Sequence, residues 1–339
     1  MDGILAPEPP ESVERGPRPR FSLLIAAYQA ADTIADAIDS ALSQTEPPFE
    51  IVVCNDGSTD GTEEALAPYR DRITYLRQEN AGEGAAKNAA ARASSGDFVV
   101  FLDADDAFLP GRLQALGDLA ELRPDLDVLA TDAYLELDGR ILRTAYDDDW
   151  KFEPVEQRQA ILERCFVDGK SAIRRTCFFE IDGFDETIRW ATDWDLWIRL
   201  ILRGARAGLI PEPLARYRLR EGSLSTNQLE LARGEVRVLE KAASRPELSA
   251  DERTTAADAL AKRRRLADLE EARAALLDGN RAARRWCLTV ARDSGQPPRA
   301  RVKTGLAVLA PWAVRVVLAR RERTRWIAGG GEWVERERV

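Results

Sequence analysis

The chain has 339 residues, no histidine and a formal net charge of -9 at pH 7. Hydrophobic residues make up 45% and charged residues 32%, which is typical of a globular protein and excludes a disordered or polytopic membrane chain. Without histidine, Ser-His-Asp catalysis, Cys-His catalysis and histidine-based metal sites are excluded. Carboxylates, or less often Lys, Tyr or Cys, must carry any acid–base chemistry. The acidic charge offers no general attraction to nucleic acid, and we expect none as a partner.

The cysteines and the N-terminus indicate the compartment. The four cysteines are far apart in sequence and form no C-x-x-C pair, so we predict buried free thiols in a reducing compartment. Residues 1–19 lack the cationic start and apolar run of a secretory signal. Their Pro, Glu and Arg content predicts a flexible tail. We therefore expect a cytoplasmic protein.

From residue 21 onward, short apolar runs alternate with helical patterns. This alternation predicts an α/β domain of Rossmann-like type, with a mostly parallel sheet flanked by helices. The continuous apolar runs are typical of strands that are covered on both faces. The strands are predicted at 21–27, 50–55, 73–77, 98–102, 127–136 and 207–217, and the helices around 34–42, 84–94, 110–122 and 194–202.

The pattern changes near residue 226. Residues 140–175 give no clear assignment, but 228–277 are rich in Ala, Leu, Glu and Arg and predict long helices. Gly279 and Asn280 predict a break between helices. We therefore expect a tail at 1–19, an α/β domain at 20–226 and an α-helical C-terminal region at 227–339.

The run 304–325 is apolar at first and then carries four arginines. It is too short, and too interrupted by Pro311 and Arg315, to predict a membrane-spanning helix. Two interpretations remain open. The run is either a basic amphipathic helix on an anionic membrane surface or a helix packed on its own domain.

The ends of the predicted strands carry the residues with chemistry. In an open parallel sheet, ligands bind beyond the carboxyl ends of the strands. The segment NDGSTDGT at 55–62 follows one strand, and its Asp56 can accept hydrogen bonds from a base or ribose. An Asx-turn of purely structural importance is the alternative.

Three carboxylates, Asp103, Asp105 and Asp106, follow another apolar strand. Like charges this close are costly unless a cation neutralises them, so a divalent metal is the simplest explanation. Mg²⁺ prefers one or two carboxylates together with substrate phosphates, and a solvated acidic loop is the alternative. The small-residue loop before the helix at 84–94 would let Lys87 face a phosphate or ribose. Neither a P-loop nor a dinucleotide-binding glycine motif is present.

Two acids lie among tryptophans at the start of the helix near residue 194. A carboxylate in an aromatic wall is partly desolvated and can act as a general base. The residues are Trp190, Asp193, Trp194 and Asp195. The alternative is an N-cap aspartate followed by a core helix.

Seven motifs in one order carry a family resemblance. They are IAAY at 25–28, NDGSTDGT at 55–62, ENAGEGAAKN at 79–88, FLDADD at 101–106, GFDE at 183–186, TDWDLWIRL at 192–200 and YRLREGSLS at 217–225. Together, over about 200 residues from Phe21 to Thr226, they resemble the family 2 glycosyltransferases of GT-A fold.

The resemblance implies roles for single residues. Ala26, Tyr28 and Asp56 would hold the base of a nucleotide-diphosphate sugar. Lys87 and Asp103 would lie near its ribose or phosphates. Asp103 and Asp105 form the D-x-D signature, in which Asp105 would ligate Mg²⁺ or Mn²⁺ directly. Asp193 would be the catalytic base, with Trp190, Trp194 and Asp195 on the acceptor side.

Two departures from the family pattern concern the same site. Thr192 stands where the family usually has glutamate. Arg220 stands where the family has a histidine that contacts metal or diphosphate. Arginine cannot ligate a cation but can neutralise diphosphate oxygens, so the metal would depend on carboxylates and water.

The resemblance implies an inverting transfer of a sugar from the nucleotide donor to a hydroxyl of a glycan or lipid-linked glycan, in bacterial surface polysaccharide synthesis. One alternative is a polyprenyl-phosphate sugar transferase at the inner face of the cell membrane, in peripheral contact through 304–325. Another is a non-catalytic helical scaffold with a degenerate pocket. A sugar nucleotidyltransferase would need a glycine-rich phosphate loop that Ala26 to Ala31 does not supply.

Overall fold

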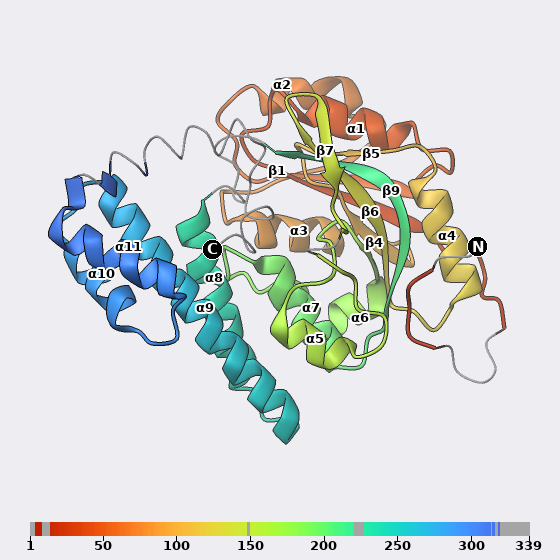
Figure 1. The fold of residues 1–339 in the computed structure, drawn as a ribbon. Helices are drawn as coiled ribbons and strands as arrows, with labels where there is room; N and C mark the ends of the chain where they lie inside the picture. Colours follow the sequence, from red (N-terminus) through yellow and green to blue (C-terminus); the bar gives the residue numbers. More distant parts are fainter. Residues whose placement is uncertain are drawn as a thin grey trace. The chain divides into compact units, whose positions relative to one another are not determined.

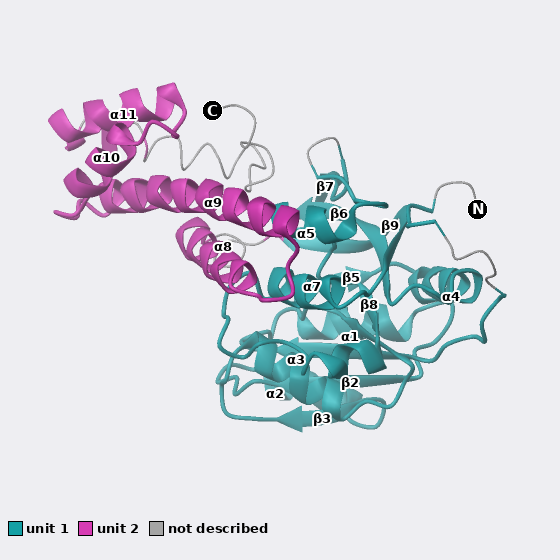
Figure 2. Ribbon diagram, turned by 90° about the horizontal axis from the view of Figure 1, so that it is seen from below, with its two compact units in different colours: residues 1–218 teal, residues 219–339 magenta. Residues whose placement is uncertain are grey.

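The computed structural model describes residues 4–8, 14–147, 150–219, 227–312, 314, 315 and 318. The chain divides into two compact units, residues 1–218 and 219–339, which Figure 2 colours separately. The boundary expected near residue 226, together with Arg220, lies outside the described residues.

The first unit is built on a mixed sheet (Figure 1). Its described strands follow the order β3-β2-β1-β4-β8-β6-β9-β5, with β7 paired to β6. The strands are β1 (Phe21–Ala27), β2 (Glu50–Asn55), β3 (Thr74–Arg77), β4 (Phe98–Phe101), β5 (Ala107–Phe108), β6 (Val128–Leu137), β7 (Arg140–Thr144), β8 (Ala172–Arg174) and β9 (Ala207–Leu219).

Strands β1 to β4 form the parallel half of the sheet. Leu23 in β1 pairs with Ile51 on one side and with Val100 on the other. All three side chains are at most 3% exposed, as expected for strands covered on both faces. The continuous apolar runs in the sequence therefore predicted these strands within one residue at each end.

The helices that connect the parallel strands lie on both faces of this half. Figure 1 shows α1 (Ile34–Leu42) and α2 (Thr62–Leu66) on one side of the sheet and α3 (Glu83–Arg92) on the other. A short 3-10 turn, η1 (Ala67–Tyr69), follows α2. Helix α3 lies on the opposite face because the order of the strands reverses after β3. Strand β4 lies on the other side of β1 from β2 and β3.

The remaining strands pair antiparallel, so the sheet is less parallel than the sequence suggested. Strand β8 runs antiparallel to both β4 and β6, and β9 runs antiparallel to β5. The span 140–175, which the sequence left unassigned, contains β7, α5 (Gln157–Glu163) and β8. These elements are short, which is why their hydrophobic period was not visible.

Three further helices complete this unit: α4 (Arg112–Leu122), α6 (Arg175–Glu180) and α7 (Thr192–Leu202). In α7, every side chain from Trp194 to Leu202 is buried. The indole Nε1 of Trp194 donates a hydrogen bond of 2.7 Å to the carbonyl oxygen of Ile161 in α5. Helix α7 is thus a core element, and its first turn is held at a defined place.

The described part of the N-terminal segment packs on the unit and is not the free tail that we predicted. The backbone of Leu5 forms a bridge with Leu209 in β9. The guanidinium of Arg18 makes ion pairs with Glu46, Asp118 and Glu121. Composition alone predicted flexibility because these partners are distant in sequence.

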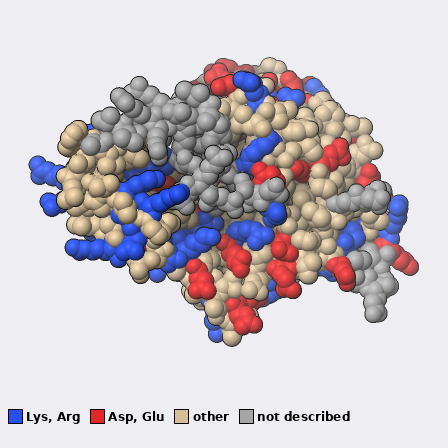
Figure 3. Space-filling view, viewed as in Figure 1, with Lys and Arg blue, Asp and Glu red and all other residues tan. Residues whose placement is uncertain are grey.

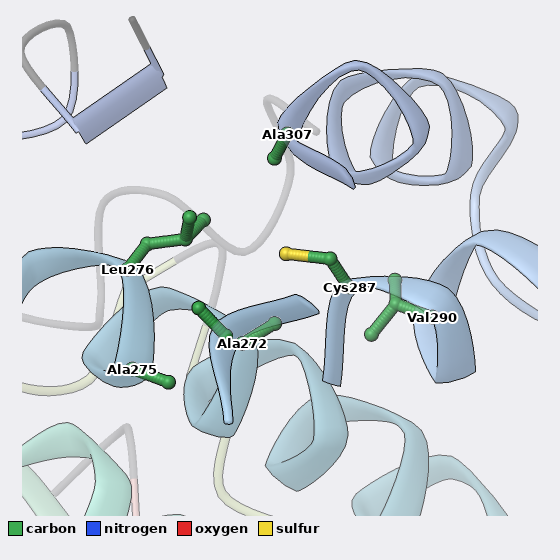
Figure 4. Packing of buried hydrophobic residues seen from close by; sticks show 7 residues of the cluster. Ala272, Ala275, Leu276, Cys287, Val290 and Ala307 are labelled. Atoms are coloured by element: carbon green, nitrogen blue, oxygen red, sulfur yellow. The ribbon is translucent and has the colours of Figure 1, made fainter. Parts of the chain in front are cut away.

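The second unit is helical in its described residues: α8 (Gln228–Ala243), α9 (Ala250–Leu277), α10 (Ala283–Arg292) and α11 (Pro298–Leu309). Gly279, with φ +67°, ends α9 at the predicted break. Figure 4 shows the packing of small side chains between α9, α10 and α11, with Ala307 facing Cys287. None of the helices in the described part of the chain is long and apolar enough to cross a membrane.

The cysteines are free, as predicted, but only two are fully buried. Cys54 and Cys287 are buried, whereas Cys165 and Cys177 are partly exposed. Burial raises the pKa of the Cys54 thiol to about 11, so this thiol is an inert part of the core.

Candidate functional site

The candidate site lies where β1, β2 and β4 end. Because these strands are parallel neighbours, the residues that follow them meet at one edge of the sheet. Tyr28 follows β1, Asp56 follows β2, and Asp103 comes two residues after β4. The structure therefore brings together residues from three motifs that are far apart in sequence.

Asp56 joins two loops at this edge. Its side chain is 2% exposed. The Oδ1 atom accepts hydrogen bonds from Gln78 Nε2 at 2.7 Å and from the backbone N–H of Ala81 at 2.9 Å. The Oδ2 atom accepts from the N–H of Gly82, also at 2.9 Å. Asp56 therefore positions the loop that leads into α3.

A pocket of about 480 Å³ opens beside this loop. It is lined by Gly57, Arg77, Gln78, Glu79 and Asn80. Gly57 has φ +72°, and a Cβ atom there would lie 2.7 Å from the backbone nitrogen of Asn80, so only glycine fits. The volume is in the range of pockets that bind small molecules.

Tyr28 and Ala26 lie at the end of β1. The Tyr28 side chain is 55% exposed, and Ala26 is partly exposed at the end of an otherwise buried strand. The next residue, Gln29, has φ +51°, and its Oε1 accepts a hydrogen bond of 2.8 Å from the N–H of Thr59. This contact ties the loop after β1 to the loop after β2. The exposed Tyr28 ring is thus available for stacking with a planar group.

Lys87 is buried and forms an ion pair with the partly exposed Asp103. Lys87, on α3, is 6% exposed, and its Nζ lies 2.8 Å from Asp103 Oδ1. The same ammonium also bonds Glu83 one turn earlier. Burial opposes the charge of Lys87, but Asp103 and Glu83 outweigh it and raise the pKa of Lys87. Burial likewise opposes ionisation of Asp103, but Lys87 and Lys170 lower the pKa of this carboxyl.

A second lysine binds the third carboxylate of the D-x-D segment. Lys170 is 5% exposed, with its Nζ 3.2 Å from Asp106 Oδ2 and 3.6 Å from Asp168 Oδ1. It also lies 4.2 Å from the ring centre of Tyr217. Asp106 Oδ1 accepts a hydrogen bond of 2.8 Å from the N–H of Arg218. Asp106 therefore links the acidic segment to β9.

Lys170 and Asp168 were not among the site residues predicted from the sequence. Both precede β8 inside the span 140–175 that gave no assignment. A single lysine close to an aspartate is a common surface pattern, so no signal in the sequence distinguished it. The long-range pairing of β8 with β4 places it beside Asp106.

Asp193 lies in the first turn of α7, close to the same cluster. Burial raises the pKa of Asp193 to about 6, a hydrogen bond from the Trp194 N–H lowers it, and Glu83 raises it further. Lys87 and Asp168 are also near enough to act on this carboxyl. A Cβ atom at Gly169 would lie 3.6 Å from Asp193 Oδ2. The group is therefore mostly ionised at neutral pH, yet it is a stronger base than an ordinary aspartate.

The expected acceptor-side residues separate into two groups. Trp190 is partly exposed near the start of α7. Trp194 and Asp195, however, are 1% and 4% exposed, so the structure places them in the core and not toward an acceptor. Asp195 Oδ2 accepts a hydrogen bond of 2.7 Å from Arg199 Nε on the same helix. Both lie in the core because α7 is buried on all sides from Trp194 onward.

The carboxylates suit a metal that is shared with a substrate. Within the described residues, no group of three or more acidic or cysteine side chains is placed to hold an ion alone. Asp103 keeps about a third of its side chain exposed, and Asp105 is also partly exposed. One or two carboxylates, completed by phosphate oxygens and water, are the ligands that Mg²⁺ and Mn²⁺ take in such sites.

The fold is the GT-A fold of glycosyltransferases. Residues 22–179, just under half of the chain, match the family model described as Glycosyl transferase family 2. Among relatives, the succinoglycan biosynthesis protein ExoO of Rhizobium meliloti is 32% identical over 219 residues, which cover 61% of this chain and 63% of that protein. The chain thus spans less than two thirds of this relative.

Solved structures share the fold. The TarS fragment 1–349 of S. aureus, in complex with UDP-GlcNAc, has a TM-score of 0.61 at 18% identity, over 91% of this chain and 92% of that one. The mannosyltransferase PcManGT of Pyrobaculum calidifontis, in complex with GDP-Man and Mn²⁺, has a TM-score of 0.55 at 18% identity, over 97% of this chain and 91% of that one.

Proposed function

We propose that the first unit transfers a sugar from a nucleotide-diphosphate donor to a hydroxyl acceptor, with inversion at the anomeric carbon. The observation that carries this proposal is the position of Asp193. Its carboxyl group, with a pKa raised by burial to about 6, is close enough to Lys87 and Glu83 for their charges to act on it. A base near a lysine that would contact the diphosphate is the arrangement that a single displacement needs.

The proposed reaction proceeds in one step. Asp193 takes the proton of the acceptor hydroxyl while that oxygen forms a bond to the anomeric carbon. The bond from that carbon to the diphosphate oxygen breaks on the opposite face, and the electron pair leaves with the diphosphate. Lys87, held by Asp103 at 2.8 Å, stabilises the negative charge on the leaving group.

The donor is held in the proposed site by the loops after β1 and β2. Tyr28 and Ala26 contact the base. Asp56 accepts hydrogen bonds from the base, and these replace some of the hydrogen bonds that it accepts from the loop before α3. Arg220, outside the described residues, would neutralise diphosphate oxygens. TarS bound to UDP-GlcNAc and PcManGT bound to GDP-Man support a nucleotide donor of this kind.

Asp105 and Asp103 would hold Mg²⁺ or Mn²⁺ with the diphosphate. The ion would supply Lewis-acid stabilisation of the leaving group. The complex of PcManGT with GDP-Man and Mn²⁺ supports this assignment.

We propose a glycan or lipid-linked glycan as the acceptor, and a protein that works at the inner face of the cell membrane. The succinoglycan biosynthesis protein ExoO, a relative over the same region, supports polysaccharide synthesis. A lipid-linked acceptor is compatible with the basic C-terminal helices.

The Asp193→Asn variant tests the base. We expect the transfer rate to fall by about 100-fold to 10,000-fold, the usual contribution of a general base, with nucleotide binding unchanged. Asp182→Asn, an exposed aspartate before the same helix, is the matched control and keeps full activity. Loss of nucleotide binding in Asp193→Asn, or retention of activity, would contradict the assignment.

Calorimetric titration with UDP, GDP, dTDP and CDP, each with and without Mn²⁺, identifies the donor class. Metal-enhanced binding of one diphosphate is the expected result. Binding without metal would indicate that Arg220 and Lys87 take the place of the cation. No binding to any of the four diphosphates would favour a non-catalytic scaffold.

A further inference from the structure

The C-terminal unit carries a strongly basic segment in an acidic protein. Residues 281–315 contain eight basic residues and one acidic residue, a net charge of +7, whereas the whole chain has -9. None of the eight makes an ion pair with another residue in the part of the chain that the structure describes. In Figure 3, the region where Figure 1 places α10 and α11 is mostly tan and blue. The segment therefore presents uncompensated positive charge.

One face of α11 packs inside the unit. Ala300, Thr304 and Ala307 are between 1% and 7% exposed. Ala307 belongs to the cluster with Cys287 and Leu276 (Figure 4). These contacts fix the rotation of α11 about its axis, so the direction of its opposite face is determined within the unit.

The opposite face is apolar and exposed. Val302 is 63% exposed, Leu306 58% and Leu309 82%, and they follow at spacings of four and three, which places them on one stripe of the helix. Trp312, three residues further, is 75% exposed. Four large apolar side chains within eleven residues are an unusual concentration on a surface.

Basic residues flank this stripe. Arg299 and Lys303 are exposed and lie three residues before Val302 and Leu306, respectively. A helix with Trp and Leu on one face and Lys and Arg beside it is typical of binding in the plane of an anionic lipid surface. With 12 residues, α11 is about 18 Å long and cannot span a bilayer.

We propose that the outer face of α11 (Val302, Leu306 and Leu309), with Trp312 beyond the end of the helix and with Arg299 and Lys303, docks on a membrane of anionic lipids. The apolar side chains enter the headgroup region, and the positive segment is attracted by lipid phosphates. This deepens the proposed function, because it names the surface through which the transferase meets a lipid-linked acceptor. An acidic protein partner would explain the charge but not the exposed Leu and Trp side chains.

Co-sedimentation of the full chain with vesicles tests the proposal. We expect binding to vesicles that contain phosphatidylglycerol and none to pure phosphatidylcholine. The double variant Leu306→Glu/Leu309→Glu should bind at least about tenfold more weakly because it loses two leucines that the lipid would bury. The variant Arg299→Gln/Lys303→Gln should lose about 25-fold, since each charge near the surface contributes about fivefold.

A matched control comes from the catalytic unit. Val155 is 67% exposed and Ile141 52%, so Ile141→Glu/Val155→Glu adds the same charges to another apolar surface and should leave vesicle binding unchanged. Equal binding to both kinds of vesicle, or wild-type binding by Leu306→Glu/Leu309→Glu, would overturn the proposal. No binding to either kind of vesicle would overturn it and favour a protein partner.

Nucleotide titration of the same proteins separates this proposal from the proposed function. Leu306→Glu/Leu309→Glu should bind nucleotide like the wild type. If the wild type binds vesicles but no nucleotide, the membrane surface stands and the transferase assignment fails. If it binds nucleotide but no vesicles, only the membrane surface fails.

Discussion

At Asp193, opposing influences act on one carboxyl group. Burial raises its pKa, the N–H of Trp194 and the ammonium of Lys87 lower it, and Glu83 and Asp168 raise it, with a result of about 6. A base that is ionised at neutral pH but more basic than a free aspartate is suited to accept a hydroxyl proton.

The pH dependence of transfer follows from this value. We expect kcat/KM to rise about tenfold per pH unit below about pH 6 and to level off above it, because only the carboxylate accepts a proton. A pH–rate profile measured with saturating metal checks this. A rise in kcat/KM centred near pH 4 would show that Asp193 does not control the rate.

Ionisation of Asp193 should also lower the free energy of unfolding. Its folded pKa lies above the ordinary value of 3.8, so its protonated form is favoured in the fold and stability is lost as pH rises from about 4 through 6. Asp193→Asn should therefore raise the free energy of unfolding near pH 8, by at most about 3 kcal/mol, and have little effect below pH 4. Urea unfolding at both pH values measures this, with Asp182→Asn as control. A loss of stability near pH 8 would contradict it.

Among the elements, α3 connects the cluster to the rest of the fold. Its Asn88 accepts a hydrogen bond of 2.8 Å from the N–H of Phe184 and donates to the Phe184 carbonyl at 2.9 Å and to Glu186 at 3.0 Å. The GFDE motif is thus fastened to the helix that carries Lys87.

Asn88→Ala should lower the free energy of unfolding by about 2 kcal/mol, because it leaves the buried backbone groups of Phe184 without partners. Asn80→Ala, at an exposed position in the preceding loop, should change it by less than about 0.5 kcal/mol. Urea denaturation curves compare the two. Equal effects would show that the Asn88 hydrogen bonds contribute little.

In the helical unit, Ser249 and Glu252 form a capping box at the start of α9. Ser249 Oγ accepts from the N–H of Glu252 at 3.2 Å, and Glu252 Oε2 accepts from the N–H of Ser249 at 2.9 Å. Ser249→Ala should cost about 1 kcal/mol, whereas Ser294→Ala in the loop after α10 should cost almost nothing. Thermal unfolding followed by circular dichroism measures both. An unchanged Tm for Ser249→Ala would argue against the cap.

For the whole molecule, ligand binding should raise the free energy of unfolding. A diphosphate with Mn²⁺ at about 100 times its Kd adds about 2.7 kcal/mol to the free energy of unfolding, which is about 5 to 10 °C in Tm for a unit of 218 residues. Chelation of the metal should remove the increase, and Asp105→Asn should abolish it. If the nucleotide still raises Tm in EDTA, arginine and lysine alone neutralise the diphosphate.

The sequence by itself determined the local elements of the parallel half-sheet and the order of its motifs. The runs at β1, β2 and β4 are continuous because both faces are buried, and the helical region after residue 226 follows from its composition. The match of residues 22–179 to the Glycosyl transferase family 2 model rests on several of the same motifs. These properties depend on neighbours along the chain, which a sequence displays directly.

Only the tertiary structure decided which charges meet and which side chains are inside. Lys170 reaches Asp106 because β8 pairs with β4, a contact between distant segments. Trp194 lies in the core beside α5, and the face of α11 that bears Leu306 lies outside because the opposite face packs on α10. Burial sets the cost of a charge and the strength of a base, and burial is a property of the packed fold.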